Sequence, residues 1–76
     1  MAEMFAVGNL SPTSYRHEVV RGLVRDRLAA ELRRVGCLGD VRYEEILVEE
    51  YTDDEGVFFP AHYEITAFAD SPEHTG

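Results

Sequence analysis

Two residues in the last third of the chain have side chains that could act together. His62 and Glu64 are two positions apart in "HYEIT", so on a strand they point to the same face. An imidazole and a carboxylate at this spacing can form an ion pair or offer two ligands to a cation. Two ligands without a cysteine pair are no zinc motif. We therefore interpret them as a polar cluster within a protein contact, with a small-ligand site as the alternative.

A second cluster of side chains that could do chemistry consists of acidic residues. The segment "EEYTDDEG" carries five carboxylates, those of Glu49, Glu50, Asp53, Asp54 and Glu55. Its spacing differs from that of an EF-hand loop, which needs alternating oxygen ligands and a glutamate at the twelfth position. The segment predicts a solvated turn whose acidic surface suits a basic protein partner, with a loose calcium or magnesium contact as the alternative.

The chain lacks the residue patterns of an enzyme. It contains no nucleophile elbow and no glycine-rich phosphate loop, and Cys37 has no base beside it in sequence. We expect Cys37 to be a buried structural residue. The sequence predicts a protein without catalytic residues, resident metal or cofactor.

Length and composition predict a single domain over residues 1–76, near the lower size limit for independent folding. One cysteine cannot form an internal disulfide, which fits a reducing cytoplasm. The first residues lack a basic region and a long apolar run, so we expect neither a signal sequence nor a membrane span.

The net charge of −8 is unevenly distributed. Residues 14–35 contain six arginines and three acids, a balance of +3, whereas residues 38–76 contain eleven acids and one arginine, a balance of −10. An acidic hairpin of this kind opposes direct binding to nucleic acid and favours a basic surface, including the arginines of a neighbouring copy.

The hydrophobic pattern predicts four main elements. These are a strand over 3–10, a helix over 12–35, and strands over 40–52 and 56–69, followed by a flexible tail over 70–76. A helical crossover makes the first two strands parallel, so the last strand fits between them. The predicted fold class is α+β with the order β-α-β-β, a three-stranded antiparallel sheet packed by one long helix.

The predicted helix has clear ends and two apolar rows. Ser11 and Pro12 suit its start, and Gly36 suits its end. One row begins Tyr15, Val19, Leu23, and a second contains Val20, Val24, Leu28 and Leu32. Either the helix wraps a wide apolar face around its own sheet, or one row is left for a second subunit.

The register of the hairpin decides which face each side chain takes. If Tyr51 pairs with Val57, the odd residues share a face and Glu45 points toward the helix. If Thr52 pairs with Val57, Ile46 and Val48 point there instead. We favour the second register, because burying an unpaired carboxylate is costly.

That register predicts a strongly apolar outer sheet face. Its main members are Tyr43, Leu47, Tyr51, Phe58 and Phe68, with His62 and Glu64 among them. Monomers rarely expose a contiguous patch of more than a few hundred Å² (roughly 300–600 Å² at most). We therefore predict a homo-oligomer in which this face is covered.

Two segments carry a resemblance to a known family. "SPTSY" at residues 11–15 is similar to the Ser-Pro-Thr-Ser-aromatic helix start of the dodecins, and "YEIT" at residues 63–66 is similar to their last strand. The resemblance covers roughly residues 3–69 and implies β-α-β-β subunits in a hollow dodecamer that stores flavin. This chain has no tryptophan to stack on a flavin, and Glu64 stands where the family has a glutamine.

Two functions follow as expectations. The first is a non-enzymatic acidic interaction protein, for example phage-encoded or regulatory, that acts as a homo-oligomer and binds a protein through its hairpin and apolar sheet face. The alternative is a dodecin-like binding or storage protein for a flavin-type small molecule. An enzyme site at a subunit interface around His62, Tyr63 and Glu64 is a third class, without a positive signal in the sequence.

Overall fold

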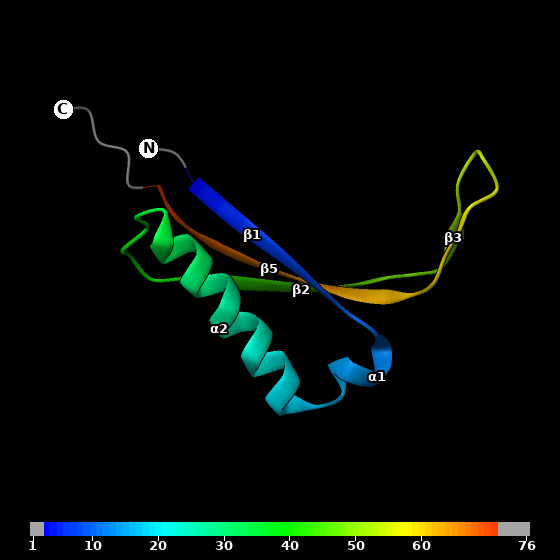
Figure 1. Ribbon diagram of the computed structural model, residues 1–76, viewed down its shortest axis with the longest axis horizontal. Coiled ribbons are helices and arrows are strands. Elements are labelled where there is room, and N and C mark those ends of the chain that lie inside the picture. The colour runs from blue at the N-terminus through cyan, green and yellow to red at the C-terminus, as the bar shows by residue number, and fades with distance from the viewer. Residues whose placement is uncertain (1–2, 72–76) are drawn as a thin grey trace.

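The structure is a computed structural model that describes residues 3–71. The elements are β1 (Glu3–Leu10), α1 (Pro12–Tyr15), α2 (Glu18–Arg34), β2 (Arg42–Val48), β3 (Tyr51–Thr52), β4 (Phe58–Phe59) and β5 (His62–Asp70). The main sheet has the order β1-β5-β2, and β5 is antiparallel to both neighbours. The predicted α+β fold, with the last strand between the first two, is confirmed (Figure 1).

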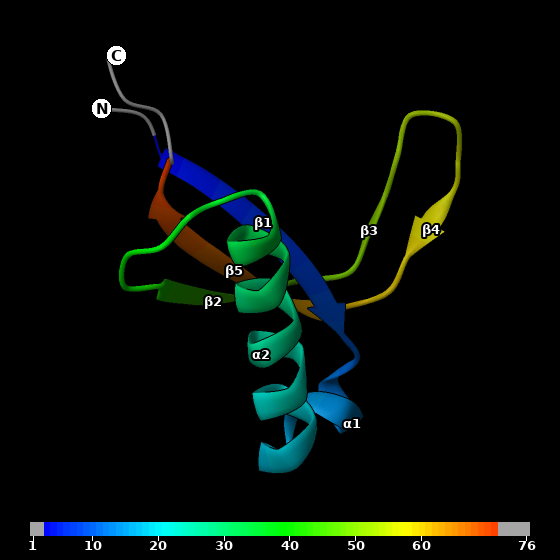
Figure 2. The same cartoon turned by 60° about the vertical axis from the view of Figure 1, so that its left-hand side comes forward.

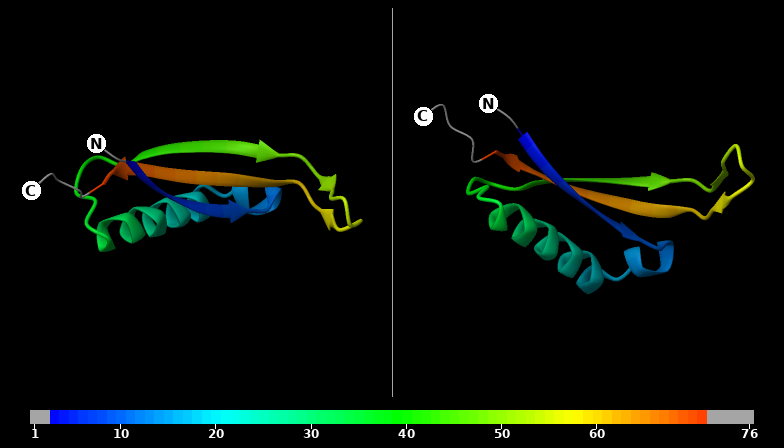
Figure 3. Two further views of the ribbon diagram at one scale, coloured as in Figure 1. Left: turned by 90° about the horizontal axis from the view of Figure 1, so that it is seen from above. Right: turned by 45° about the horizontal axis from the view of Figure 1, so that its top comes forward.

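One face of this sheet is covered and the other is not. The main helix α2 lies across one face, and none of the helices and strands formed by residues 3–71 covers the opposite face (Figures 2 and 3). The molecule is accordingly thin, with extents of 48 × 32 × 16 Å. None of the described residues forms a helix long and apolar enough to cross a membrane.

The core lies between α2 and the central strand. Its buried side chains are Leu10, Leu28, Leu32, Cys37, Ile65, Ala67 and Ala69. The alanines of β5 and the buried Gly8 of β1 let the helix approach the sheet closely: a Cβ at Gly8 would lie 2.9 Å from Val24 Cγ1. The expectation of a buried cysteine is confirmed, since Cys37 is fully buried with its Sγ 3.8 Å from Met4 Sδ.

The prediction of one unbroken helix over residues 12–35 is wrong, because the chain turns between α1 and α2. The start is as expected: Pro12 is the first residue of α1, and Ser11 Oγ accepts a hydrogen bond from Ser14 N–H at 3.1 Å. His17 has extended backbone angles and begins a second helix. The Arg21 guanidinium donates to the Tyr15 carbonyl at 2.7 Å, which satisfies an acceptor that the break would leave free.

The end of the helix follows the sequence prediction. α2 ends at Arg34, and Gly36 has a φ of 98°, the left-handed conformation that favours glycine after a helix. The reading in which both helix rows wrap around the chain's own sheet is wrong. Val20 and Val24 pack against the core, whereas Val19 and Leu23 are exposed.

Both long hairpin strands are interrupted near one proline. β2 and β3 are separated at Glu49 and Glu50, and β4 and β5 at Pro60 and Ala61. Proline has no N–H to donate to a strand ladder, which explains the break. The segment 49–61, here called the arm, stands away from α2 and the main sheet (Figures 1 and 2). The chain's radius of gyration is 14.9 Å, against about 11 Å expected for a compact chain of this length.

The favoured hairpin register is wrong. Glu45 pairs with Ile65, and Tyr51 pairs with Phe59, so odd residues lie beside odd residues throughout. Ile65 is buried under α2, and Glu45 shares its face. The carboxylate is tolerated there because it is not unpaired: Arg25 forms an ion pair with it, and the Tyr15 hydroxyl donates a hydrogen bond to it.

The C-terminal boundary also differs from the prediction. Asp70, expected to belong to a flexible tail, is the last residue of β5. Residues 72–76 of that predicted tail lie outside the described residues.

Candidate functional site

The candidate site has two parts, the uncovered face of the main sheet and the arm. The uncovered face, here called the outer face, follows from the strand registers, since alternate residues point away from α2. Its members are Glu3, Phe5, Val7 and Asn9 of β1; Arg42, Glu44, Ile46 and Val48 of β2; and His62, Glu64, Thr66 and Phe68 of β5.

The apolar part of the outer face is centred on β1 and the end of β5. Phe5 pairs with Phe68 across the strands, with ring centroids 6.3 Å apart. Phe5 is 65% exposed, Val7 48% and Ile46 51%. Three large apolar side chains are therefore exposed on the same face of the sheet, with Glu64 and Thr66 of β5 between Ile46 and the β1 pair. No helix or strand of the described part of the chain lies over this face (Figure 3).

The register divides the five residues predicted to form one patch. Phe68 lies on the outer face, while Tyr43 and Leu47 have the opposite parity and point to the face of α2. Tyr51 and Phe58 lie in the separate two-stranded sheet of the arm. Of the five predicted residues, Phe68 alone is a member of the outer face as defined above. The sequence reasoning missed Phe5, Val7 and Ile46. The alternation within "EMFAVGNL" was the signal that could have identified the first two.

His62 and Glu64 do lie together on the outer face, as predicted. His62 Nε2 is 3.4 Å from a Glu64 carboxylate oxygen, and His62 Nδ1 is 3.1 Å from the Pro60 carbonyl. Glu64 lies between Asn9 and Ile46 on the neighbouring strands. Within residues 3–71, no group of three or more His, Cys, Asp or Glu side chains is arranged to hold a metal ion.

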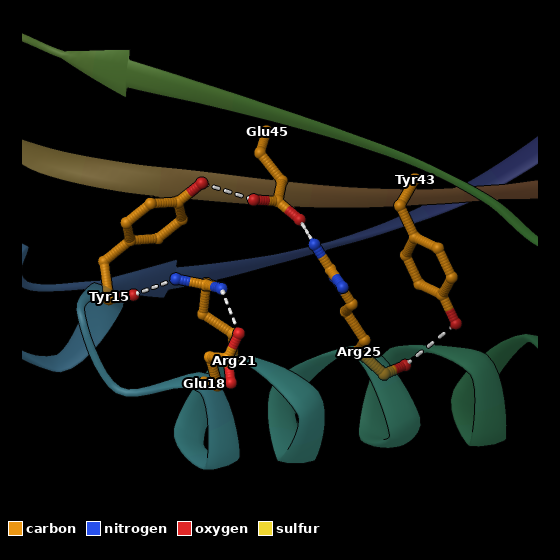
Figure 4. A network of polar contacts seen from close by, with 6 residues as sticks. All are labelled: Tyr15, Glu18, Arg21, Arg25, Tyr43 and Glu45. Atoms are coloured by element: carbon orange, nitrogen blue, oxygen red, sulfur yellow. Dashed lines mark hydrogen bonds and ion pairs between the residues drawn. The ribbon is translucent and has the colours of Figure 1, made fainter.

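A polar network joins the helices to the sheet on the covered face (Figure 4). Glu45 accepts from the Tyr15 hydroxyl and pairs with Arg25. The Tyr15 ring also stacks on Tyr63, with centroids 3.7 Å apart and planes 6° apart. The Arg25 guanidinium lies 5.7 Å from the centre of the Tyr43 ring. These contacts link α1 and α2 to the sheet and hold both helices in position on it, although Arg25 Nε is buried without a hydrogen-bond partner among the described residues.

The arm combines aromatic and acidic side chains. Tyr51 stacks on Phe59 with centroids 4.8 Å apart, and Phe58 is 58% exposed. Four of the predicted acids, Glu49, Glu50, Asp54 and Glu55, are exposed.

Asp53 instead has a structural role in the arm. Its carboxylate accepts hydrogen bonds from the N–H groups of Glu55 and Val57, each at 2.9 Å. Gly56, which closes this turn, has the positive φ predicted for it, at 84°. The turn therefore depends on Asp53 and Gly56, while the remaining four acids are exposed.

Comparison of the chain with protein-family models, with curated proteins and with solved structures gave no match. The function must therefore be argued from the two surfaces themselves.

Proposed function

We propose that the protein is a non-enzymatic protein-binding module that acts as a homo-oligomer. The observation that carries this proposal is the outer face, where Phe5, Val7 and Ile46 are exposed on a sheet with one uncovered side. Exposed apolar residues on a sheet face are stabilised by a covering layer, and the same surface on a second copy can provide it through a two-fold axis.

The arm supplies the second binding surface. Residues 49–61 carry five acids and no basic residue, and four of those acids are exposed. A two-stranded hairpin is marginally stable on its own, so exposed aromatics at its surface favour a partner that stabilises it. The acidic charge favours a basic protein surface over nucleic acid.

The polar groups support binding rather than catalysis. The Cys37 thiol is fully buried, and the Glu45 carboxylate is held by Arg25 and Tyr15. His62 contacts Glu64 and the Pro60 carbonyl, but no nucleophilic side chain within residues 3–71 bonds to its ring. We propose a reducing, cytoplasmic setting for one reason: the chain has a single cysteine, which cannot form an internal disulfide.

A dodecin-like storage protein is the second candidate. The observation that favours it is the stacking of Tyr15 on Tyr63, because these residues belong to the two segments that carry the resemblance. A three-stranded sheet of this strand order, with a helix on one face, is compatible with such a subunit. A flavin would need a stacking partner other than tryptophan in this chain.

The test is light scattering on the untagged protein after size exclusion, with absorbance spectra across the peak. We expect a discrete oligomer without visible absorbance, which Phe5→Glu dissociates. Leu38→Glu is the matched control, since Leu38 is 82% exposed but lies outside the outer face. A monomer at all concentrations would overturn the proposal. Flavin absorbance on an assembly of about twelve chains, as the resemblance implies, would support the second candidate instead.

A further inference from the structure

The side of α2 that faces away from the sheet carries a second unpartnered surface. Val19, Leu23 and Ala30 are spaced so that they lie along one side of the helix, here called the outer stripe. Val19 is 75% exposed and Leu23 is 63% exposed. A helix packed only on its own sheet has no need of valine and leucine there.

Basic side chains border the outer stripe. Arg27, Arg33 and Arg34 are exposed and lie within about 80° of its axis on the helical wheel, at 100° per residue. Arg27 has a loose contact with Glu31 at 3.9 Å, with both side chains largely solvated. Asp26 is the one acid of α2 that falls beside the stripe. The surface is therefore apolar along its centre and basic along its margins.

The arm has the opposite charge and a similar mixture of residues. Val57 and Phe58 are 47% and 58% exposed, and Glu49, Glu50, Asp54 and Glu55 are exposed beside them. β3 and β4 pack chiefly against each other, and the arm stands apart from α2 of its own chain (Figures 1 and 2). Apolar groups on both surfaces, with acids on one and arginines on the other, are the complementarity that specific interfaces use.

We infer that the arm of one copy docks on the outer stripe of α2 in a neighbouring copy. The inference rests on the proposed self-association and names the basic surface that the acidic arm binds. Val57 and Phe58 would cover Val19 and Leu23, and the arm acids would face Arg27 and Arg34. The contact joins two different surfaces, so it is distinct from contacts made by the outer face of the sheet.

The test is a charge exchange between the two surfaces. Variant A carries Glu50→Arg and Glu55→Arg in the arm, and variant B carries Arg27→Glu and Arg34→Glu on α2. Each variant alone places like charges at the contact. An equal mixture restores opposite charges at both contacts between A and B, because the arm of each matches the helix of the other. Asp40→Arg, at an exposed acid outside both surfaces, is the control for a change in net charge.

The apparent dissociation constant is measured by sedimentation at low and high salt, with circular dichroism to verify folding. We expect A and B each to weaken self-association about tenfold or more at low salt, and the mixture to recover most of it as A–B complexes. Wild-type oligomers with unaltered association in A and B would overturn this inference and leave the proposed function standing. Weakened association that the mixture does not recover would also overturn it. A monomeric wild type would overturn the proposed function itself.

Discussion

Arg25 and Glu45 form an ion pair across the interface between α2 and β2, at a position that a simple hydrophobic pattern would assign to an apolar residue. The Glu45 side chain is 17% exposed and that of Arg25 is 39% exposed. The pair is supported by the Tyr15 hydroxyl, while Arg25 Nε is buried without a hydrogen-bond partner among the described residues. The contact therefore fixes β2 against the helix at some cost in desolvation.

Glu45→Gln is expected to destabilise the fold by about 1–3 kcal/mol, because it leaves the Arg25 charge without its partner. The measurement is the free energy of unfolding in urea. Asp40→Asn is the control for the loss of one carboxylate charge, since Asp40 is exposed and lies outside both the outer face and the arm, and it should change stability by less than about 0.5 kcal/mol. Equal effects of the two substitutions would show that the Glu45 contacts contribute little.

Tyr15→Phe should cost about 1 kcal/mol, because it removes the hydrogen bond to Glu45 and keeps the stacking on Tyr63. Combining it with Glu45→Gln in a double-mutant cycle tests whether the two side chains act through each other. Tyr51→Phe serves as the control, since the Tyr51 hydroxyl has no hydrogen bond within residues 3–71. Strict additivity in the cycle would contradict the contact.

Two glycine-to-alanine substitutions should act in opposite directions. Gly22→Ala should stabilise α2 by up to about 1 kcal/mol, because alanine has the higher helix propensity and the added Cβ meets nothing within 4 Å outside the adjacent helix backbone. Gly8→Ala should destabilise the fold by about 1–3 kcal/mol, because its Cβ would meet Val24 Cγ1 at 2.9 Å. Thermal unfolding of both variants at one protein concentration measures the difference. A neutral Gly8→Ala would mean that α2 can move away from β1 at little cost.

Cys37 should be unreactive in the folded protein. It is fully buried, with its Sγ against Met4 Sδ. A thiol reagent such as 5,5′-dithiobis(2-nitrobenzoate) should therefore label it only at the rate of unfolding, and fully in denaturant. A variant with Leu38→Cys in a Cys37→Ala background places the thiol at a neighbouring exposed site and should react at once. Rapid labelling of wild-type Cys37 would disprove the burial.

Much of the fold was predictable because the local signals agree with the tertiary structure. The span of β1, the Ser11 cap, the Gly36 helix end and the Gly56 turn all follow from residue types whose backbone preferences are strong. The strand order follows from the helical crossover. These features need no knowledge of distant contacts.

The hairpin register, by contrast, could not be predicted without knowledge of contacts between residues that are distant in sequence. The strand over 42–48 has apolar residues at both parities, Tyr43 and Leu47 on one side and Ile46 and Val48 on the other. Pattern alone favours the register that exposes Glu45. Only its contacts with Arg25 and Tyr15, which are 20 and 30 residues away in sequence, make the opposite register favourable.

The prediction of which residues form the outer face failed for the same reason. The face on which a residue lies depends on the register, so an error of one residue assigned Tyr43 and Leu47 to the wrong face and missed Ile46. His62 and Glu64 were placed together correctly because their relation depends only on strand periodicity within one element.

The 16 Å thickness of the molecule has a consequence for its lifetime. A sheet with one helix layer has half of the core that a sandwiched sheet would have. If copies cover one another's exposed faces, dissociation and unfolding become linked equilibria, and the melting temperature should rise with protein concentration. The lifetime of the protein would then depend on its own concentration. Below the concentration at which copies associate, each chain would lose the neighbouring copy that covers its exposed faces and protects it from proteolysis.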